Sequence, residues 1–112
     1  MLTKCDFNEL LAKFNNEMKS IFKEKLVETI LFGSFVNGYP DDGSDIDLMV
    51  LVDMQEEEID KYFNKITEII TDLDIEYNVF LAPIIQNYSD YENLKDVLPF
   101  FKNVQKGVKI SA

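Results

Sequence analysis

Apolar side chains recur at steps of three and four over residues 7–25, a spacing that predicts an amphipathic helix. This stripe consists of Phe7, Leu10, Leu11, Phe14, Met18, Ile21 and Phe22. Asp6 precedes the stripe and Glu9 follows three residues later, a capping-box pattern that predicts where the helix starts. The run from Val27 to Phe32 is rich in β-branched residues and predicts a short strand.

The middle of the chain predicts a turn, a strand and a second helix. Residues 33–44 concentrate Gly, Pro and Asp, which is turn chemistry. Asp45 to Val52 then reads as a mostly apolar strand that is buried on both faces after its first three residues. Asp53 and Glu56 repeat the capping-box pattern, and the following helix is expected to run to about Leu73. Its expected inward positions are Ile59, Phe63, Ile66, Ile70 and Leu73.

The last third of the chain predicts shorter elements. Ile75 to Ile85 reads as a third strand, and Pro83 places it at an edge or end of the sheet, because proline cannot donate to a central ladder. Ser89 begins a capping pattern for a short helix, and Pro99 suits the first turn of a last helix. Val108 to Ile110 predicts a final short strand.

The order of these elements predicts the fold class. It reads helix, strand, turn, strand, helix, strand, two helices and strand. The connection over residues 33–44 is neither a tight hairpin nor a full crossover helix, so we expect a mixed sheet. This is an α+β fold with a small mixed β-sheet flanked by helices. The chain has 112 residues, which predicts a single domain over residues 1–112.

Charge and composition limit the partners and the chemistry. The formal net charge is −10, and the chain has no Arg, His or Trp. Its lysines are scattered, so a long nucleic acid is not an expected substrate. Without His, neither a Ser-His-Asp triad nor a histidine zinc ligand can form. No apolar run predicts a membrane span or a secretory signal, and Cys5 is the only cysteine, so we expect a cytoplasmic protein.

Two polar motifs lie at the ends of the first two predicted strands. Gly33 and Ser34 follow the first strand, where the glycine lets a phosphate approach the backbone and the Ser34 hydroxyl can donate to phosphate oxygens. Asp45 and Asp47 open the second strand, where the period of two places both carboxylates on one face. Two adjacent carboxylates repel each other unless a cation lies between them, and Mg²⁺ prefers such ligands.

These motifs together resemble the signature of the DNA polymerase β-type nucleotidyltransferases. The segment Gly33-Ser34, ten intervening residues and Asp45-Ile46-Asp47 carries the resemblance. The greatest similarity is to the minimal nucleotidyltransferases, small single domains often paired with a HEPN-type protein. The resemblance covers the whole chain and implies the nucleotidyltransferase fold.

The resemblance also assigns site residues. Gly33 and Ser34 would hold the triphosphate, with Asn37 and Ser44 as further nucleotide-binding candidates. Many members of the family have an arginine where this chain has Asn37, which predicts weaker nucleotide binding unless a lysine compensates. Asp45 and Asp47 would ligate two Mg²⁺ ions together with the bound NTP.

The family normally adds a third carboxylate from a later strand. Glu76 is the acidic candidate here and is expected to share a strand face with Asn78. Alignment on Ala82-Pro83 instead places Asn78 at the family's usual position. Asp45, Asp47 and Glu76 are therefore the expected catalytic residues, with the choice between Glu76 and Asn78 left open.

The function implied by the resemblance is transfer of a nucleoside monophosphate from an NTP, with ATP expected, to a hydroxyl group of a protein partner or small molecule. A HEPN-type partner within a toxin–antitoxin pair is the favoured acceptor. Two alternatives stay open. One is a catalytically degenerate binding module that neutralises its partner by occlusion, and the other is a subunit of an aminoglycoside-type nucleotidyltransferase. The sequence also leaves homo-oligomer formation open.

Overall fold

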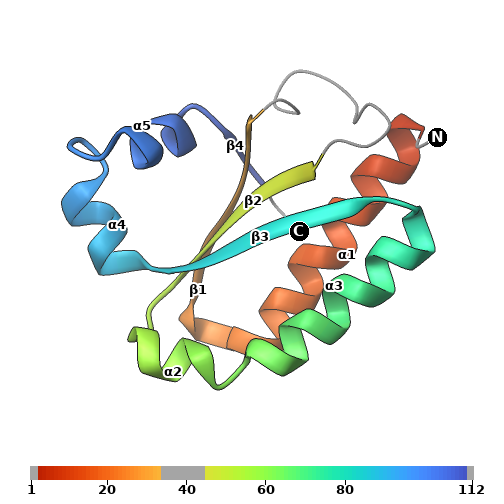
Figure 1. Ribbon diagram of the computed structural model, residues 1–112, viewed down its shortest axis with the longest axis horizontal. Helices are drawn as coiled ribbons and strands as arrows, with labels where there is room; N and C mark the ends of the chain where they lie inside the picture. The colour runs from red at the N-terminus through yellow and green to blue at the C-terminus, as the bar shows by residue number, and fades with distance from the viewer. Residues whose placement is uncertain (1–2, 34–44, 111–112) are drawn as a thin grey trace.

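The computed structural model describes residues 3–33 and 45–110 as helices around one sheet (Figure 1). The helices are α1 (Lys4–Phe22), the short 3-10 helix η1 (Lys23–Lys25), α2 (Glu56–Asp60), α3 (Phe63–Tyr77), α4 (Tyr88–Leu94) and α5 (Pro99–Gln105). The strands are β1 (Leu26–Phe32), β2 (Asp45–Val52), β3 (Phe80–Asn87) and β4 (Val108–Lys109). This is the predicted order of elements, except that η1 follows the first helix and the predicted second helix is divided in two.

The sheet is mixed, as predicted. Its strand order is β3-β2-β1-β4, with β1 antiparallel to both β2 and β4 and with β2 parallel to β3. A parallel pair needs a long crossover, which α2 and α3 provide here. β3 forms an edge of the sheet, so the prediction that Pro83 lies in an edge or end strand is confirmed.

Helices cover both faces of the sheet. Helices α1 and α3 lie side by side against one face, and α4 and α5 lie over the other (Figure 1). Alternate residues of β2 divide between the two faces: Ile46 and Leu48 pack toward α1 and α3, whereas Met49 and Leu51 pack toward α4 and α5. The α+β class with flanking helices is therefore confirmed. Within residues 3–33 and 45–110, no helix combines the length and apolar character that crossing a membrane requires.

The first helix begins earlier than predicted. Thr3 is its N-cap, and the Thr3 hydroxyl accepts a hydrogen bond of 3.0 Å from the backbone N–H of Asp6. The Asp6 carboxylate completes the capping box by accepting from the Thr3 backbone N–H. Asp6 is thus the third residue of the first turn rather than the cap, and the predicted box of Asp6 and Glu9 is wrong.

The second predicted helix is interrupted. Gln55, not Asp53, caps α2, and no side-chain hydrogen bond closes a capping box there. The chain turns between Asp60 and Phe63, and the ring of Tyr62 then packs edge-to-face on Phe22 in the core, with 5.4 Å between ring centroids. Phe63 is consequently 69% exposed, so its predicted inward position is wrong.

The third strand starts later than predicted, because α3 continues through Tyr77. The helix ends at Asn78, whose φ of 54° and ψ of 55° place it in the left-handed region. Asparagine tolerates this conformation better than most residues, which makes it a common helix terminator. β3 begins only at Phe80, so neither Glu76 nor Asn78 lies on a strand.

Candidate active site

Strand β2 starts beside the end of β1 (Figure 1). Two residues with carboxylate side chains, Asp45 and Asp47, stand at this start. Asp47 is paired with Phe32, the last residue of β1. Ile46 is fully buried against α1 and α3, and strand alternation therefore turns Asp45 and Asp47 to the opposite face. Asp45 is exposed and Asp47 is half-buried, so the pair is open to a ligand from solution.

Gly33 lies directly against the Asp47 carboxylate. Its φ is +80°, a conformation that favours glycine. A Cβ atom at this position would overlap Oδ2 of Asp47 and lie 3.3 Å from its Cγ. Only glycine therefore lets the backbone at the end of β1 approach this carboxylate.

Among the described residues, no protein cation pairs with Asp45 or Asp47. Burial raises the pKa of Asp47, and the neighbouring charge of Asp45 raises it further. Within the described ranges, the lysine ion pairs engage Glu9, Glu76, Glu92 and Glu28, and none reaches Asp45 or Asp47. Two adjacent carboxylates fit a hard divalent cation such as Mg²⁺, which would favour the ionised form of Asp47.

The strand next to the pair supplies no further carboxylate. In the parallel register, Asp45 is paired with Phe80 and Asp47 with Ala82. Glu76 lies instead on α3, where its Oε2 accepts a hydrogen bond of 2.7 Å from Nζ of Lys13. Over residues 3–33 and 45–110, no three Asp, Glu, Cys or His side chains converge as metal ligands, so Glu76 is not brought to the pair.

Asp74 is a carboxylate that the sequence analysis missed. Its Oδ1 accepts a hydrogen bond of 2.9 Å from the backbone N–H of Leu81, the residue paired with Ile46. Burial raises the pKa of Asp74 and the Asp45 charge raises it further, although the Leu81 hydrogen bond acts in the opposite direction. Asp74 is therefore close enough to Asp45 to feel its charge, and its hydrogen bond holds the start of β3. No rule of residue spacing in the sequence identifies this role of Asp74.

Two exposed phenylalanine rings flank the carboxylates. Phe80, which is paired with Asp45, is 63% exposed. Phe100 is 44% exposed, and its ring packs edge-to-face on Phe32, with 5.6 Å between ring centroids. Neither ring was predicted from the sequence to belong to the site.

The remaining nucleotide-binding candidates cannot be placed. Ser34, Asn37 and Ser44 lie outside the described residues. The structure brings together Gly33, Asp45 and Asp47, and separates Glu76 from them.

Comparison with known proteins identifies related sequences. Residues 11–111 match the family described as Nucleotidyltransferase domain. Three proteins of Methanocaldococcus jannaschii, all provisionally named protein adenylyltransferases, are similar to the chain. The first is 35% identical over 77 residues, which cover 69% of this chain and 76% of the relative. The second is 29% identical over 104 residues (92% and 69%), and the third is 28% identical over 94 residues (84% and 86%).

Proposed function

Because this chain belongs to the nucleotidyltransferase domain family, we propose that it transfers AMP from ATP to a hydroxyl group of a protein. The acceptor oxygen forms a bond to the α-phosphorus, the bond from that phosphorus to the bridging oxygen breaks, and pyrophosphate leaves. The acceptor proton passes to solvent. The observation that carries the proposal is the close approach of Gly33 to Asp47, beside Asp45 at the open end of β2.

The residues of this chain would act by positioning and by charge. Asp45 and Asp47 would hold Mg²⁺, two ions with the bound nucleotide, and the metal would neutralise charge on the triphosphate. Gly33 keeps the end of β1 free of side-chain atoms, so that phosphate oxygens can reach backbone donors. Ser34, Asn37 and Ser44 remain the proposed phosphate contacts. Such electrostatic preorganisation is usually the largest contribution to catalysis of this kind.

The choice of ATP and of a protein acceptor rests on the relatives and on the surface. The similar proteins carry the name protein adenylyltransferase. Phe80 and Phe100 expose apolar area on either side of the carboxylates, and exposed apolar patches commonly mark contact surfaces. A HEPN-type protein, inactivated within a toxin–antitoxin pair, is the acceptor that we propose.

A second candidate is a binding module that neutralises its partner by occlusion. The observation that favours it is the absence of a carboxylate on β3, where Phe80 and Ala82 stand beside Asp45 and Asp47. Such a module would retain the fold and the exposed aromatic surface and would need no nucleotide.

A calorimetric titration of MgATP into the full chain tests the proposal, repeated with Asp47→Asn. The matched control is Asp53→Asn, which removes the same charge just beyond the opposite end of β2. We expect Mg²⁺-dependent binding in the wild type and in Asp53→Asn, and at least about a tenfold loss of affinity in Asp47→Asn. Absence of binding at millimolar MgATP would remove the nucleotidyltransferase proposal for this chain and favour the binding module.

Transfer is then tested with ATP labelled at the α-phosphate and a purified HEPN-type protein. We expect label on the acceptor protein, and none with Asp45→Asn or Asp47→Asn. If MgATP binds and no label reaches the protein, the acceptor assignment fails while the nucleotide site stands.

A further inference from the structure

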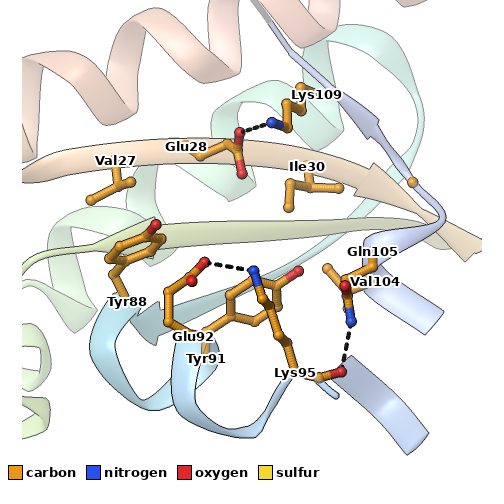
Figure 2. Close-up of a pocket in the computed structure, with 11 residues that line it drawn as sticks. Val27, Glu28, Ile30, Tyr88, Tyr91, Glu92, Lys95, Val104, Gln105 and Lys109 are labelled. Atoms are coloured by element: carbon orange, nitrogen blue, oxygen red, sulfur yellow. Dashed lines mark hydrogen bonds and ion pairs between the residues drawn. The ribbon is translucent and has the colours of Figure 1, made fainter. Parts of the chain in front are cut away.

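A polar cavity lies on the same face of the sheet as the carboxylate pair. It has a volume of about 300 Å³ and is enclosed by β1, α4, the end of α5 and β4 (Figure 2). Ile30 of β1 lines it, whereas Phe32, two residues further along the strand, is paired with Asp47. The cavity is thus distinct from the nucleotide site, and its size suits a small molecule.

A tyrosine hydroxyl group faces this cavity (Figure 2). Tyr91 is only 4% exposed, and its ring packs against Phe101 with 5.2 Å between centroids. The Tyr91 hydroxyl points into the cavity (Figure 2), and no residue of the described ranges forms a hydrogen bond with it. Burial raises the pKa of this phenol, so it remains a donor at neutral pH. The hydroxyl atom is not enclosed by the protein, so it is available to donate to water or to a ligand in this space.

The charged residues around the cavity balance one another. Nζ of Lys109 lies 3.1 Å from Oε1 of Glu28, and Nζ of Lys95 lies 3.1 Å from Oε1 of Glu92 (Figure 2). Each ammonium group has three donors and each carboxylate has about four acceptor sites, so all four groups can form further hydrogen bonds. All four charges act on the Tyr91 hydroxyl, which therefore lies among them.

We propose that this cavity binds a small zwitterion of the free amino acid class. The ligand's ammonium group would meet the free oxygens of Glu28 and Glu92, and its carboxylate would meet Lys95 and Lys109. The Tyr91 hydroxyl would donate to the same carboxylate. A simple anion would face two carboxylates and a simple polyamine would face two ammonium groups, so a ligand with both charges complements this cavity best.

The test uses the full chain and four probes: glycine, L-alanine, L-serine and L-glutamine. Two matched compounds serve as controls, since N-acetylglycine lacks the ammonium charge and glycinamide lacks the carboxylate. Inorganic phosphate and spermidine test the single-charge alternatives. Melting temperature is measured with each compound at about 10 mM, and affinities then follow from calorimetry.

We expect at least one free amino acid to raise the melting temperature and the control compounds to leave it unchanged. Tyr91→Phe should weaken binding about tenfold, because it removes one hydrogen bond to a charged group. Tyr62→Phe, which changes a tyrosine outside the cavity, should leave the affinity unchanged. Glu92→Gln provides a second variant at a half-exposed position, and it should also weaken binding.

Three results would overturn the proposal. The first is that no amino acid of the panel changes the melting temperature. The second is that N-acetylglycine or glycinamide binds as well as glycine. The third is that Tyr91→Phe and Glu92→Gln both bind as tightly as the wild type.

Discussion

Gly33 combines a positive φ with a carboxylate that an added Cβ atom would overlap, and either feature alone would resist a side chain. We predict that Gly33→Ala lowers the free energy of unfolding by about 1–3 kcal/mol, since the new methyl group meets both backbone strain and the Asp47 carboxylate. It should also weaken MgATP binding, because Asp47 must move. Urea denaturation and calorimetry measure the two effects.

A double-mutant cycle with Asp47→Ala separates the causes. If the overlap matters, Gly33→Ala costs less free energy in the Asp47→Ala background than in the wild type. An equal cost in both backgrounds would show that the carboxylate does not restrict this position.

Asn78 and Glu76 differ in their structural roles, and neither role places them at the carboxylate pair. Asn78 ends α3 in the left-handed region, and Glu76 pairs with Lys13. We predict that Asn78→Gly and Glu76→Gln keep MgATP affinity within about threefold, which calorimetry measures. Asn78→Ala should lower the free energy of unfolding by about 1 kcal/mol, because alanine is strained in this conformation. Loss of MgATP binding in Glu76→Gln would show that Glu76 acts at the site after all.

Helix α1 is fixed to the sheet by one buried polar contact among many apolar ones. The Thr29 hydroxyl of β1 donates a 2.7 Å hydrogen bond to Oδ1 of Asn15 on α1, and both residues are buried. We predict that Thr29→Val lowers the free energy of unfolding by about 1–3 kcal/mol, because the Asn15 amide loses its partner. Urea denaturation measures this cost, and Thr71→Val on α3 serves as an exposed control.

Replacing both partners gives the decisive comparison. The pair Asn15→Leu with Thr29→Val leaves no buried group unsatisfied, so its cost should be smaller than that of Thr29→Val alone. A strictly additive cost would contradict coupling between the two side chains.

Two features of strand β3 hinder the pairing of a further strand at this edge of the sheet. Leu81 and Pro83 are two residues apart, so their backbone N and C=O groups face the same side of the strand. The Leu81 N–H is taken by Asp74, and Pro83 has no N–H to offer. This arrangement makes the edge less able to pair with another strand. It also fixes the start of β3 beside the carboxylate pair.

The whole molecule carries a formal net charge of −10, with two adjacent carboxylates at its candidate active site. We predict that NaCl raises the melting temperature by a few degrees between about 10 and 300 mM, since salt screens self-repulsion. MgCl₂ at equal ionic strength should raise it further, because the metal binds the folded protein. Differential scanning calorimetry at pH 7 measures both effects.

The rise in melting temperature that MgCl₂ causes beyond NaCl at equal ionic strength should vanish in Asp45→Asn and Asp47→Asn. It should remain in Asp53→Asn. Without metal, Asp47→Asn should melt slightly higher than the wild type at neutral pH. The pKa of Asp47 is raised in the folded state, so its ionisation lowers stability as pH rises above the ordinary value near 3.8. Below that value the difference should disappear. Equal stabilisation by MgCl₂ in all four proteins would contradict a metal site at the pair.

Local sequence patterns predicted the order of most elements, the mixed sheet, the edge position of Pro83 and the common face of Asp45 and Asp47. These features depend on periodicity and on residues a few positions apart, so local rules suffice. The same local rules singled out Gly33, because a glycine directly after a predicted strand marks a turn.

Which side chains meet across the sheet depends on tertiary packing. Tyr62 packs on Phe22 where the second predicted helix is interrupted, Glu76 pairs with Lys13 on α1, and β3 presents Phe80 rather than a carboxylate to Asp45. The cavity around Tyr91 likewise requires β1, α4 and β4 to come together. Such contacts join residues far apart in the chain, and their free energy depends on packing and register, which no local pattern encodes.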